Sequence, residues 1–502
     1  MRRASSFEIV AARAWNVLNE GRPFTPVFVA GVFLLCHIGD WGQPAFWPAM
    51  AGALGAVLPL FVVYFFYDFP LYLRNYLWLP VVAAVVIWEG TRDVLGLWLA
   101  GIGLFFFFTV FFWGTFYYRM RIGTPWNNFA RFWKLVLQHS DSTSGNAQEQ
   151  LPKTMLLLYL LHLTYGWIRG GGAKAADWGT LYVFIAAVWL LAWILHRYLF
   201  DWKPKERTES PGTLPRVGEA VSRKVYVLVV DGMRKERFEQ ANAPFLKKLR
   251  AEGTEFTSME TVYPARTVVC FSSMFTGAYP REHGIKSNFV YRLGVRTETI
   301  FDSLRKVGKT GRLLGIAHLI DSMGDDVDAI TAVMRHDRAD AETVEMAKRI
   351  VEERNPDLMV VQLIGTDQIG HSRGVFYDDY IEKIEEADRL LENFVGWLDE
   401  RGLLEEATMI VCADHGQAIG IGGHGHLDEG ERFVPFFLAG HGIRRGVKVD
   451  APHSLVSMAP TLAYLLGAPY PDHSRGPVLT EALEPFGERS AAIEKKEGYG
   501  SS

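Results

Sequence analysis

The sequence predicts an α-helical transmembrane domain followed by an α/β domain whose central sheet carries helices on both faces. Two observations lead to this fold class. The first 200 residues contain apolar runs, several of which reach the roughly 20 residues that a membrane-spanning helix requires. From Lys224 onward, short β-branched runs alternate with amphipathic helical segments, which is the pattern of a sheet flanked by helices.

The composition excludes several classes of protein. The 502 residues include 52 basic and 56 acidic side chains, a formal charge of −4, so we expect no nucleic acid polymer as partner. The three cysteines, Cys36, Cys270 and Cys412, are far apart in the sequence and form no Cys-x-x-Cys motif. They offer neither a disulfide framework nor a cysteine-rich zinc module, so histidines and carboxylates must hold any metal.

Six apolar runs predict six transmembrane helices within residues 1–200. The first and fifth runs are short and carry His37 and His162, so five spans are the alternative. A polar stretch at 1–22 precedes the first run and no small-residue cleavage pattern follows it, which argues against a cleaved signal peptide. The runs lie at about 25–38, 45–67, 71–88, 94–118, 155–167 and 181–200.

The loops give a prediction of membrane orientation. With six spans, one side of the membrane collects 14 Lys and Arg residues and the other collects 3, so the positive-inside rule places the C-terminal domain in the cytoplasm. With five spans that domain moves to the opposite face. The segment 126–138 mixes aromatic and basic residues and predicts either an amphipathic helix on the membrane surface or a solvated loop helix.

Charged residues, prolines and glycine at 201–222 indicate a linker. We therefore expect a transmembrane domain at 1–200, the α/β domain at 223–485 and a flexible tail at 486–502. Within the α/β domain, helices are predicted at 243–252, 299–307, 340–354 and 377–400.

Three predicted strands of the α/β domain each end in an acid. The strand at 225–230 leads to Asp231, the strand at 358–364 leads to Asp367, and the strand at 408–413 leads to Asp414. The carboxyl ends of the strands of an open α/β sheet meet at one edge, where functional residues gather. We therefore expect the three carboxylates to lie close together.

Histidines accompany two of these acids. A helix or tight turn would bring Asp367 and His371 together, and Asp414-His415 precedes a glycine-rich segment that contains His424 and His426. Each feature alone has an ordinary explanation, and for Asp231-Gly232 a turn is the better one. Taken together, acids and imidazoles at one edge of a sheet are a ligand set for zinc and predict a site for two metals.

A hydroxyl group completes this candidate site. Thr267 precedes a predicted helix that ends at Gly277, so its hydroxyl lies at a helix N-terminus, where backbone N–H groups favour a phosphate. Two interpretations are equally good: Thr267 is a nucleophile, or it only caps the helix. For the adjacent Arg266, a solvated arginine is favoured over a clamp for a substrate phosphate.

These segments together resemble the alkaline phosphatase superfamily, in particular its type I phosphodiesterase and nucleotide pyrophosphatase branch. The resemblance covers about 224–479, and the order and gaps of the motifs agree. The segments that carry it are Val230-Asp231-Gly232, Tyr263-Pro264-Ala265-Arg266-Thr267, 276–285 with Asn288, 367–371, Ala413-Asp414-His415-Gly416 and Gly423-His424-Gly425.

The resemblance implies an alkaline-phosphatase-like fold and two zinc ions, with Mn²⁺ or another divalent ion as the alternative. It implies Thr267 as nucleophile, Asn288 as the group that steadies a phosphate oxygen, and a structural role for His283. The implied ligands of the first ion are Asp231, Thr267, Asp414 and His415, and those of the second are Asp367, His371 and His424, with His426 as the alternative to His424.

The implied function is that of a membrane-anchored phosphodiesterase or pyrophosphatase that forms a covalent phosphothreonine. Water as acceptor makes a hydrolase, and an alcohol makes a phosphotransferase. The implied substrate is a phosphodiester, and a lipid-linked one is favoured because membrane lipids surround the N-terminal domain. A third hypothesis is an inactive membrane sensor or scaffold, against which the complete ligand set argues.

Two local features bear on the substrate and the membrane face. Nucleotide pyrophosphatases usually have Pro-Asn after the nucleophile, whereas this chain has Val268-Val269-Cys270, which argues against a nucleotide. The segments 363–371 and 414–424 also look like those of the ethanolamine-phosphate transferases of glycolipid anchors. The catalytic domains of those enzymes face away from the cytoplasm, so the resemblance and the charge count predict opposite faces.

Overall fold

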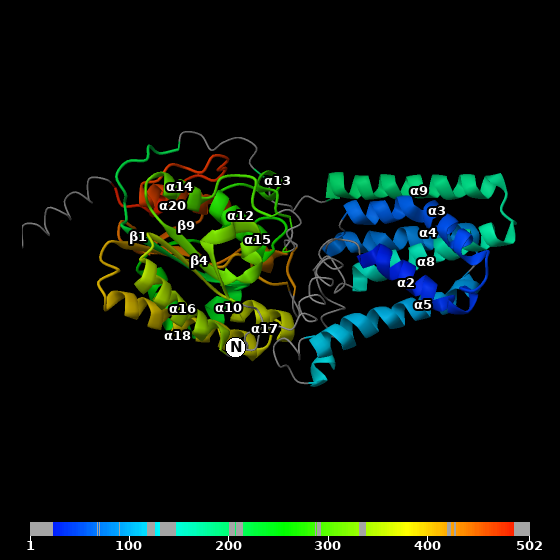
Figure 1. Cartoon of the computed structure of the whole chain (residues 1–502), viewed down its shortest axis with the longest axis horizontal. Helices are drawn as coiled ribbons and strands as arrows, with labels where there is room; N and C mark the ends of the chain where they lie inside the picture. The colour runs from blue at the N-terminus through cyan, green and yellow to red at the C-terminus, as the bar shows by residue number, and fades with distance from the viewer. Residues whose placement is uncertain are drawn as a thin grey trace, which may run out of the picture. The chain divides into compact units, whose positions relative to one another are not determined.

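The computed structural model forms two compact units, one running from Arg3 to Lys203 and the other mainly from Pro204 to Ser502 (Figure 1). Most of the predicted linker, the whole predicted tail and His426 lie outside the described residues. The described residues are 24–67, 69, 71–89, 91–117, 126–130, 147–199, 206, 214–286, 288, 293–330, 338–418, 423–425 and 428–485.

The N-terminal unit consists of apolar helices packed around α8 (Ala147–Gly170), which contacts α2, α3, α4 and α5. The central position of α8 explains why its residues from Leu156 to Leu161 are all buried. The other helices are α2 (Phe24–Cys36), α3 (Phe46–Phe66), α4 (Trp78–Trp88), α5 (Thr91–Phe106) with a π-helical continuation (Phe107–Tyr117), and α9 (Ala175–Ile194) with the continuation Leu195–Leu199.

Three helices of the described residues are long and apolar enough to cross a membrane: Phe46–Phe66, Arg92–Phe112 and Ala175–Leu199. The other apolar runs also form helices, but α2 has only 13 residues, which is about 20 Å of helix. The count of six spans, or five, therefore stays a prediction. Of the segment predicted to lie on the membrane surface, only 126–130 belongs to the described residues.

Helix α8 begins eight residues before the predicted apolar run and brings a charged pair into the unit. Lys153 and Glu149 form an ion pair whose side chains are 3% and 0% exposed. The Lys153 ammonium lies 5.5 Å from the ring centres of both Tyr64 and Phe69. The sequence did not predict this buried pair, because 147–154 looks like a polar loop when its neighbours in space are unknown.

The C-terminal unit contains an eight-stranded sheet in the order β5-β4-β6-β1-β7-β8-β2-β9. The strands from β5 to β7 are parallel, while β8 runs antiparallel to both of its neighbours. The bounds are β1 (Lys224–Val230), β2 (Thr254–Phe256), β4 (Gly311–Ile316), β5 (Val327–Ile330), β6 (Leu358–Leu363), β7 (Ala407–Cys412), β8 (Phe436–Gly440) and β9 (Val447–Val449), and a separate parallel pair joins β3 (Met259–Glu260) to β10 (His453–Ser454).

Helices cover both faces of this sheet, as predicted. Helix α18 and helix α20 both contact β1, and Figure 1 shows them on opposite sides of the sheet. All seven residues of β1 are buried, which is why its sequence is a continuous apolar run without alternation. The helices are α10 (Lys235–Gln240), α11 (Pro244–Ala251), α12 (Thr267–Thr276), α13 (Pro280–His283), α14 (Ile300–Lys306), α15 (Ile320–Met323), α16 (Ala339–Arg354), α17 (Gly365–Arg373), α18 (Asp378–Asp399), α19 (Glu429–Arg432) and α20 (Met458–Leu466).

The three strands predicted to carry acids are β1, β6 and β7, and they are neighbours. Val225 of β1 lies opposite Leu358 of β6 on one side and Thr408 of β7 on the other. The α/β fold class and the four predicted helices are confirmed, with bounds within a residue of the prediction. The strands β2, β4, β5, β8 and β9 were not predicted from the sequence.

Candidate metal centre

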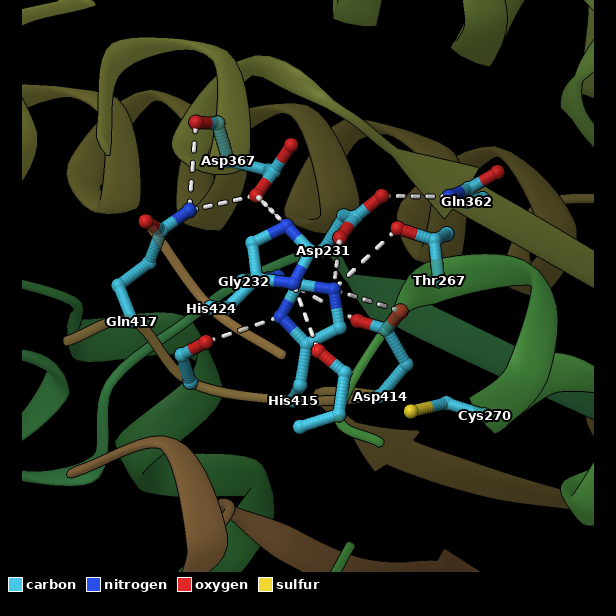
Figure 2. Close-up of polar contacts among 12 residues, drawn as sticks. Asp231, Gly232, Thr267, Cys270, Gln362, Asp367, Asp414, His415, Gln417 and His424 are labelled. Carbon is cyan, nitrogen blue, oxygen red and sulfur yellow. Dashed lines mark hydrogen bonds and ion pairs between the residues drawn. The ribbon is translucent and has the colours of Figure 1, made fainter. Parts of the chain in front are cut away.

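The central parallel strands bring three carboxylates to one edge of the sheet. Asp231 directly follows β1, Asp414 lies two residues after β7, and Asp367 lies in the first turn of α17, which begins after β6. Figure 2 shows the three side chains gathered around the imidazoles of His415 and His424. The predicted convergence of the strand-end acids is therefore what the structure contains.

The first group of candidate ligands is Asp231, Asp414 and His415. The His415 Nε2 atom lies 3.5 Å from Asp231 Oδ1 and 3.4 Å from Asp414 Oδ2. All three side chains are buried, and their ligand atoms lie within 4.8 Å of one another. At these distances the three atoms could all bind one shared ion.

The second group is Asp367, His371 and His424. The spacing of four places His371 one turn after Asp367 on α17, so that its Nε2 atom lies 3.4 Å from Asp367 Oδ2. The His424 Nε2 atom lies 3.6 Å from Asp367 Oδ1 and 3.1 Å from His371 Nε2. His424 reaches the site, whereas the alternative His426 lies outside the described residues.

Backbone carbonyl groups fix the tautomers of the two buried imidazoles. His415 Nδ1 lies 2.9 Å from the Gly416 oxygen, and His424 Nδ1 lies 2.7 Å from the Ala265 oxygen. A carbonyl oxygen only accepts, so each Nδ1 carries the proton and each Nε2 turns a lone pair toward the acids. A second partner of this kind is typical of metal-binding histidines.

The two groups belong to one site. The rings of His415 and His424 stack with their centres 3.8 Å apart and their planes inclined by 17°. Each imidazole belongs to a different group, so the groups lie side by side rather than in separate pockets (Figure 2). A substrate that reached one group would therefore also reach the other.

Thr267 is the first residue of α12 and its hydroxyl lies in this site. Thr267 Oγ1 is 3.2 Å from His415 Nε2, and the side chain is buried. The helix cap is Arg266, without a side-chain capping hydrogen bond, so the interpretation of Thr267 as a cap is wrong. The interpretation of Arg266 as a solvated arginine is also wrong, because the residue is 6% exposed.

Asn288 lies against the same end of α12. Its Oδ1 atom accepts a hydrogen bond of 2.9 Å from the Val268 N–H group. That bond fixes the amide, so its NH₂ group remains to donate elsewhere. His283 instead bonds to structural groups: its Nδ1 accepts from the Ile285 N–H and its Nε2 lies 2.9 Å from Ser273 Oγ.

The electrostatics of the cluster disfavour charge on its own side chains. Burial raises the pKa of Asp231 well above its usual value, and the Asp414 and Asp367 carboxylates raise it further. Burial also raises the pKa of Asp414. Burial, together with the neighbouring His415 and His371, lowers the pKa of His424 well below its usual value. A positive charge from outside the chain would remove the penalty on both carboxylates.

Two buried oxygen atoms support a cation at this place. Within the described part of the chain, Asp231 Oδ1 and Asp414 Oδ2 have no hydrogen-bond partner, and they are the atoms that face His415 Nε2. Buried polar atoms are rarely left unsatisfied. A divalent cation between them would satisfy both, and carboxylates with imidazoles suit zinc or manganese. The residues present therefore fit the implied metals.

Two glutamines of the site were missed by sequence reasoning. Gln362 Nε2 donates to Asp231 Oδ2 over 2.6 Å, and Gln417 Nε2 donates to Asp367 Oδ1. A signal for Gln362 exists, because it is a lone amide in the otherwise apolar strand at 358–364. Gln417 carries no such signal, since it follows the Asp414-His415-Gly416 motif in a polar loop.

The C-terminal domain is similar to a known family. Residues 225–309 and 321–421 match the model of the family described as type I phosphodiesterase / nucleotide pyrophosphatase. The match includes Asp231, Thr267, Asp367 and Asp414. The resemblance inferred from the motifs is confirmed.

Three curated proteins illustrate the similarity. Venom phosphodiesterase CdcPDE of Crotalus durissus collilineatus is 26% identical over 209 residues, 37% of this chain and 25% of that protein. Ectonucleotide pyrophosphatase/phosphodiesterase family member 1 of Mus musculus is 24% identical over 238 residues, 43% and 26% of the two chains. The catalytic subunit of GPI ethanolamine phosphate transferase 3 of Mus musculus is 30% identical over 128 residues, 25% and 11%.

The chain spans about a quarter of the length of the first curated relatives it matches. Among solved structures, murine ectonucleotide pyrophosphatase / phosphodiesterase 5 aligns with 52% of this chain and 100% of its own, at 13% identity and a TM-score of 0.44. Wild-type alkaline phosphatase PafA aligns with 54% of this chain and 100% of its own, at 14% identity and a TM-score of 0.44.

Proposed function

Because the C-terminal domain resembles the type I phosphodiesterase / nucleotide pyrophosphatase family, we propose that this chain is a metal-dependent phosphodiesterase or pyrophosphatase anchored in a membrane. Its covalent intermediate is a phosphothreonine at Thr267. The observation that carries the proposal is the place of the Thr267 hydroxyl, 3.2 Å from His415 Nε2 at the edge shared by both ligand groups.

Each ligand group holds one divalent ion, zinc in the first instance. A pair of such ions lowers the pKa of a hydroxyl group and neutralises negative charge on a reacting phosphate. The ligands of the first ion are Asp231, Thr267, Asp414 and His415, and those of the second are Asp367, His371 and His424.

The chain's own residues carry out the first half of the reaction. The Thr267 hydroxyl loses its proton to solvent, and its oxygen forms a bond to phosphorus while the bond to the leaving alcohol breaks. The leaving oxygen takes a proton from solvent. The Asn288 NH₂ group, held through its Oδ1 by the Val268 N–H, donates to a non-bridging phosphate oxygen.

The second half of the reaction decides between two related functions. Attack by water on the phosphothreonine restores Thr267 and makes the protein a hydrolase. Attack by an alcohol makes it a phosphotransferase, and the similarity to the GPI ethanolamine phosphate transferase subunit favours this second candidate. The two differ only in the acceptor that reaches the same phosphothreonine.

The substrate is a phosphodiester, and we place it among lipid-linked molecules. Three helices of the N-terminal unit have the length and composition of membrane spans, which would hold the catalytic domain near lipid headgroups. The residues after Thr267, Val268-Val269-Cys270, are all buried, so they do not offer polar contacts to a nucleotide base.

The membrane face of the catalytic domain is a separate proposal with two predicted outcomes. The charge count predicts the cytoplasmic face, and the family resemblance predicts the other face. A protease added to sealed membrane vesicles of known orientation distinguishes them, because only an outward-facing catalytic domain is cleaved.

A single set of measurements tests the proposed function. Purified full-length protein, first stripped by a chelator, is given Zn²⁺ and an aryl phosphodiester in water, and the reaction is quenched in acid for mass spectrometry. We expect metal-dependent release of one aryl alcohol and, on Thr267, a phosphoryl group that still carries the second ester substituent of the substrate. Turnover that appears only with an added alcohol or glycan acceptor would favour the transferase. Turnover without any phosphorylated Thr267, in protein that releases the alcohol rapidly, would contradict the covalent route.

A further inference from the structure

Two buried glutamines lie behind the two candidate metal ions, one for each ligand group. We propose that Gln362 and Gln417 are positioning residues: Gln362 sets the metal affinity of the group of Asp231, Asp414 and His415, and Gln417 sets that of the group of Asp367, His371 and His424. The inference rests on the metal sites of the proposed function and adds a separate support for each ion.

Gln362 is held at both ends of its amide. Its Nε2 atom donates to Asp231 Oδ2 over 2.6 Å, and its Oε1 atom accepts from the Ile316 N–H over 2.9 Å. An amide with a fixed acceptor end cannot rotate to present its oxygen to Asp231. The donated bond occupies Oδ2, so Asp231 Oδ1 is the oxygen that faces His415 and the metal position.

The fold leaves room for this amide by means of a glycine. Gln362 lies in β6, opposite Val229 of β1, and its side chain reaches β4. A Cβ atom at Gly315 of β4 would lie 2.5 Å from Gln362 Oε1. Three neighbouring strands thus shape the position of one amide, and that position aims one carboxylate.

Gln417 acts on the second group in the same manner. It is fully buried, and its Nε2 atom donates both to Asp367 Oδ1 and, over 3.3 Å, to the Asp367 main-chain oxygen. Because both acceptors belong to Asp367, the nitrogen end of the Gln417 amide must face Asp367. Figure 2 shows the Gln417 amide nitrogen pointing at Asp367 from the side opposite the imidazoles.

Two features indicate that the hydrogen bonds to Asp367 hold the Gln417 side chain in its position. A Cβ atom at Gly232 or Gly370 would lie 3.0 Å or 2.7 Å from Gln417 Nε2, so glycines flank the amide on two sides. The Gln417 Oε1 atom is buried without a hydrogen-bond partner among the described residues. A buried acceptor left unsatisfied destabilises the folded protein, so the hydrogen bonds of the donor end must compensate for it.

A neutral donor suits this task better than a charged one. Lysine or arginine at either position would hold the carboxylate but would also cancel its negative charge, which the metal needs. An amide orients the carboxylate and leaves its charge in place. When a residue that hydrogen-bonds to a metal ligand is removed, the metal affinity of the site typically falls about 10- to 100-fold.

The test measures Zn²⁺ affinity of full-length protein by competition with a chelator, with metal content checked by elemental analysis. To isolate the first group, Gln362→Met and Gln417→Met are each placed in a His371→Ala background. To isolate the second group, they are placed in an Asp414→Asn background. Gln240→Met, an exposed glutamine on α10, is the matched control.

We expect Gln362→Met to weaken Zn²⁺ binding about 10- to 100-fold in the first group and Gln417→Met to do so in the second, with each change confined to its own group. Unchanged affinities, or equal losses in both groups, would overturn the inference while the metal sites stand. A wild-type protein that binds no Zn²⁺ would overturn the proposed function itself. Should Gln362→Met fail to fold, Gln417→Met still decides, because Oε1 of Gln417 has no described bond to lose.

Discussion

Each of the two units buries charged side chains, and the two do so in opposite ways. In the N-terminal unit Glu149 and Lys153 have opposite charges and bond to each other directly. In the C-terminal unit Asp231 and Asp414 have the same charge and each leaves one oxygen without a partner in the described residues. The difference therefore lies in charge: Lys153 balances the charge of Glu149 from within the chain, whereas the carboxylate cluster needs a cation supplied from outside to balance its charge.

This difference separates a structural role from a chemical one. Burying an ion pair costs desolvation, which the attraction between its two opposite charges offsets at least in part. Burying several carboxylates together costs desolvation that the hydrogen bonds from Gln362 and the Gly232 N–H offset only in part, as the raised pKa of Asp231 reflects. Such an arrangement is expected where metal binding supplies the missing energy.

The largest expected effect concerns Thr267, which lies in the carboxylate and imidazole cluster of the C-terminal unit. Thr267→Ala removes the nucleophile, so turnover of an aryl phosphodiester should fall roughly 10⁴-fold or more, while metal content changes little. Thr267→Ser, which keeps a hydroxyl, is the matched control and should retain part of the activity. Full turnover in the alanine variant would remove threonine from its role.

Substitutions in the Glu149–Lys153 ion pair should mainly change the stability of the protein. Lys153→Met leaves the Glu149 charge buried without its lysine partner and should lower the free energy of unfolding by about 3 to 5 kcal/mol. Thermal unfolding in detergent measures the change. The double variant Glu149→Gln with Lys153→Met should recover most of the loss. If the double variant were the less stable of the two, an unbalanced Glu149 charge would not be the cause of the loss in Lys153→Met.

Removal of one ligand from the candidate metal centre should lower its metal content rather than the stability of the protein. His371→Ala leaves two ligands in the second group and should weaken its metal affinity about 100-fold or more, so that elemental analysis finds about one metal per chain rather than two. His453→Ala alters a histidine of β10 outside both groups and is the control. Two metals retained in His371→Ala would show that the second group is wrongly assigned.

Asp340 is intermediate between the two clusters, because backbone amides satisfy it. Its carboxylate accepts hydrogen bonds from the Ile364 and Gly365 N–H groups before α17, and burial raises its pKa to about 6. A carboxyl group with a raised pKa in the folded state stabilises the protein fully below its unfolded pKa, near 4, and loses that contribution as the pH rises through 6.

Asp340→Asn should remove this dependence. Relative to wild type, the variant should gain stability between pH 4 and pH 6, by at most about 1.4 kcal/mol per pH unit. Thermal unfolding across this range measures the difference, and Asp450→Asn, at an exposed position, is the control. A constant difference between Asp340→Asn and wild type would show that Asp340 does not titrate there.

Much of the site was predictable because its residues follow strand ends. The runs before Asp231, Asp367 and Asp414 are apolar, and strands of an α/β sheet deliver such residues to one edge. The spacing of Asp367 and His371 required only a helix, which α17 provides. Arg266 was misjudged because a polar residue beside a helix start is usually solvated, and only tertiary packing buries it.

The short strands and the glutamines could not be predicted in the same way. Strands such as β2 and β9 have three residues each, too few for a periodic pattern. Gln362 and Gln417 act through contacts with Asp231 and Asp367, which are 131 and 50 residues away in the chain. The buried Glu149 was likewise invisible, since a polar helical turn looks the same whether it faces solvent or neighbouring helices.

The sequence by itself determined which side chains could do chemistry and in what order the strands would present them, because apolar runs and spacings are local properties of the chain. Tertiary structure alone decided that β6, β1 and β7 are neighbours, that Thr267 faces His415, and which oxygens of Asp231 and Asp414 stay unsatisfied. The physical reason is that pairing and burial depend on residues far apart in the chain, and only the folded protein brings them within a few ångströms of one another.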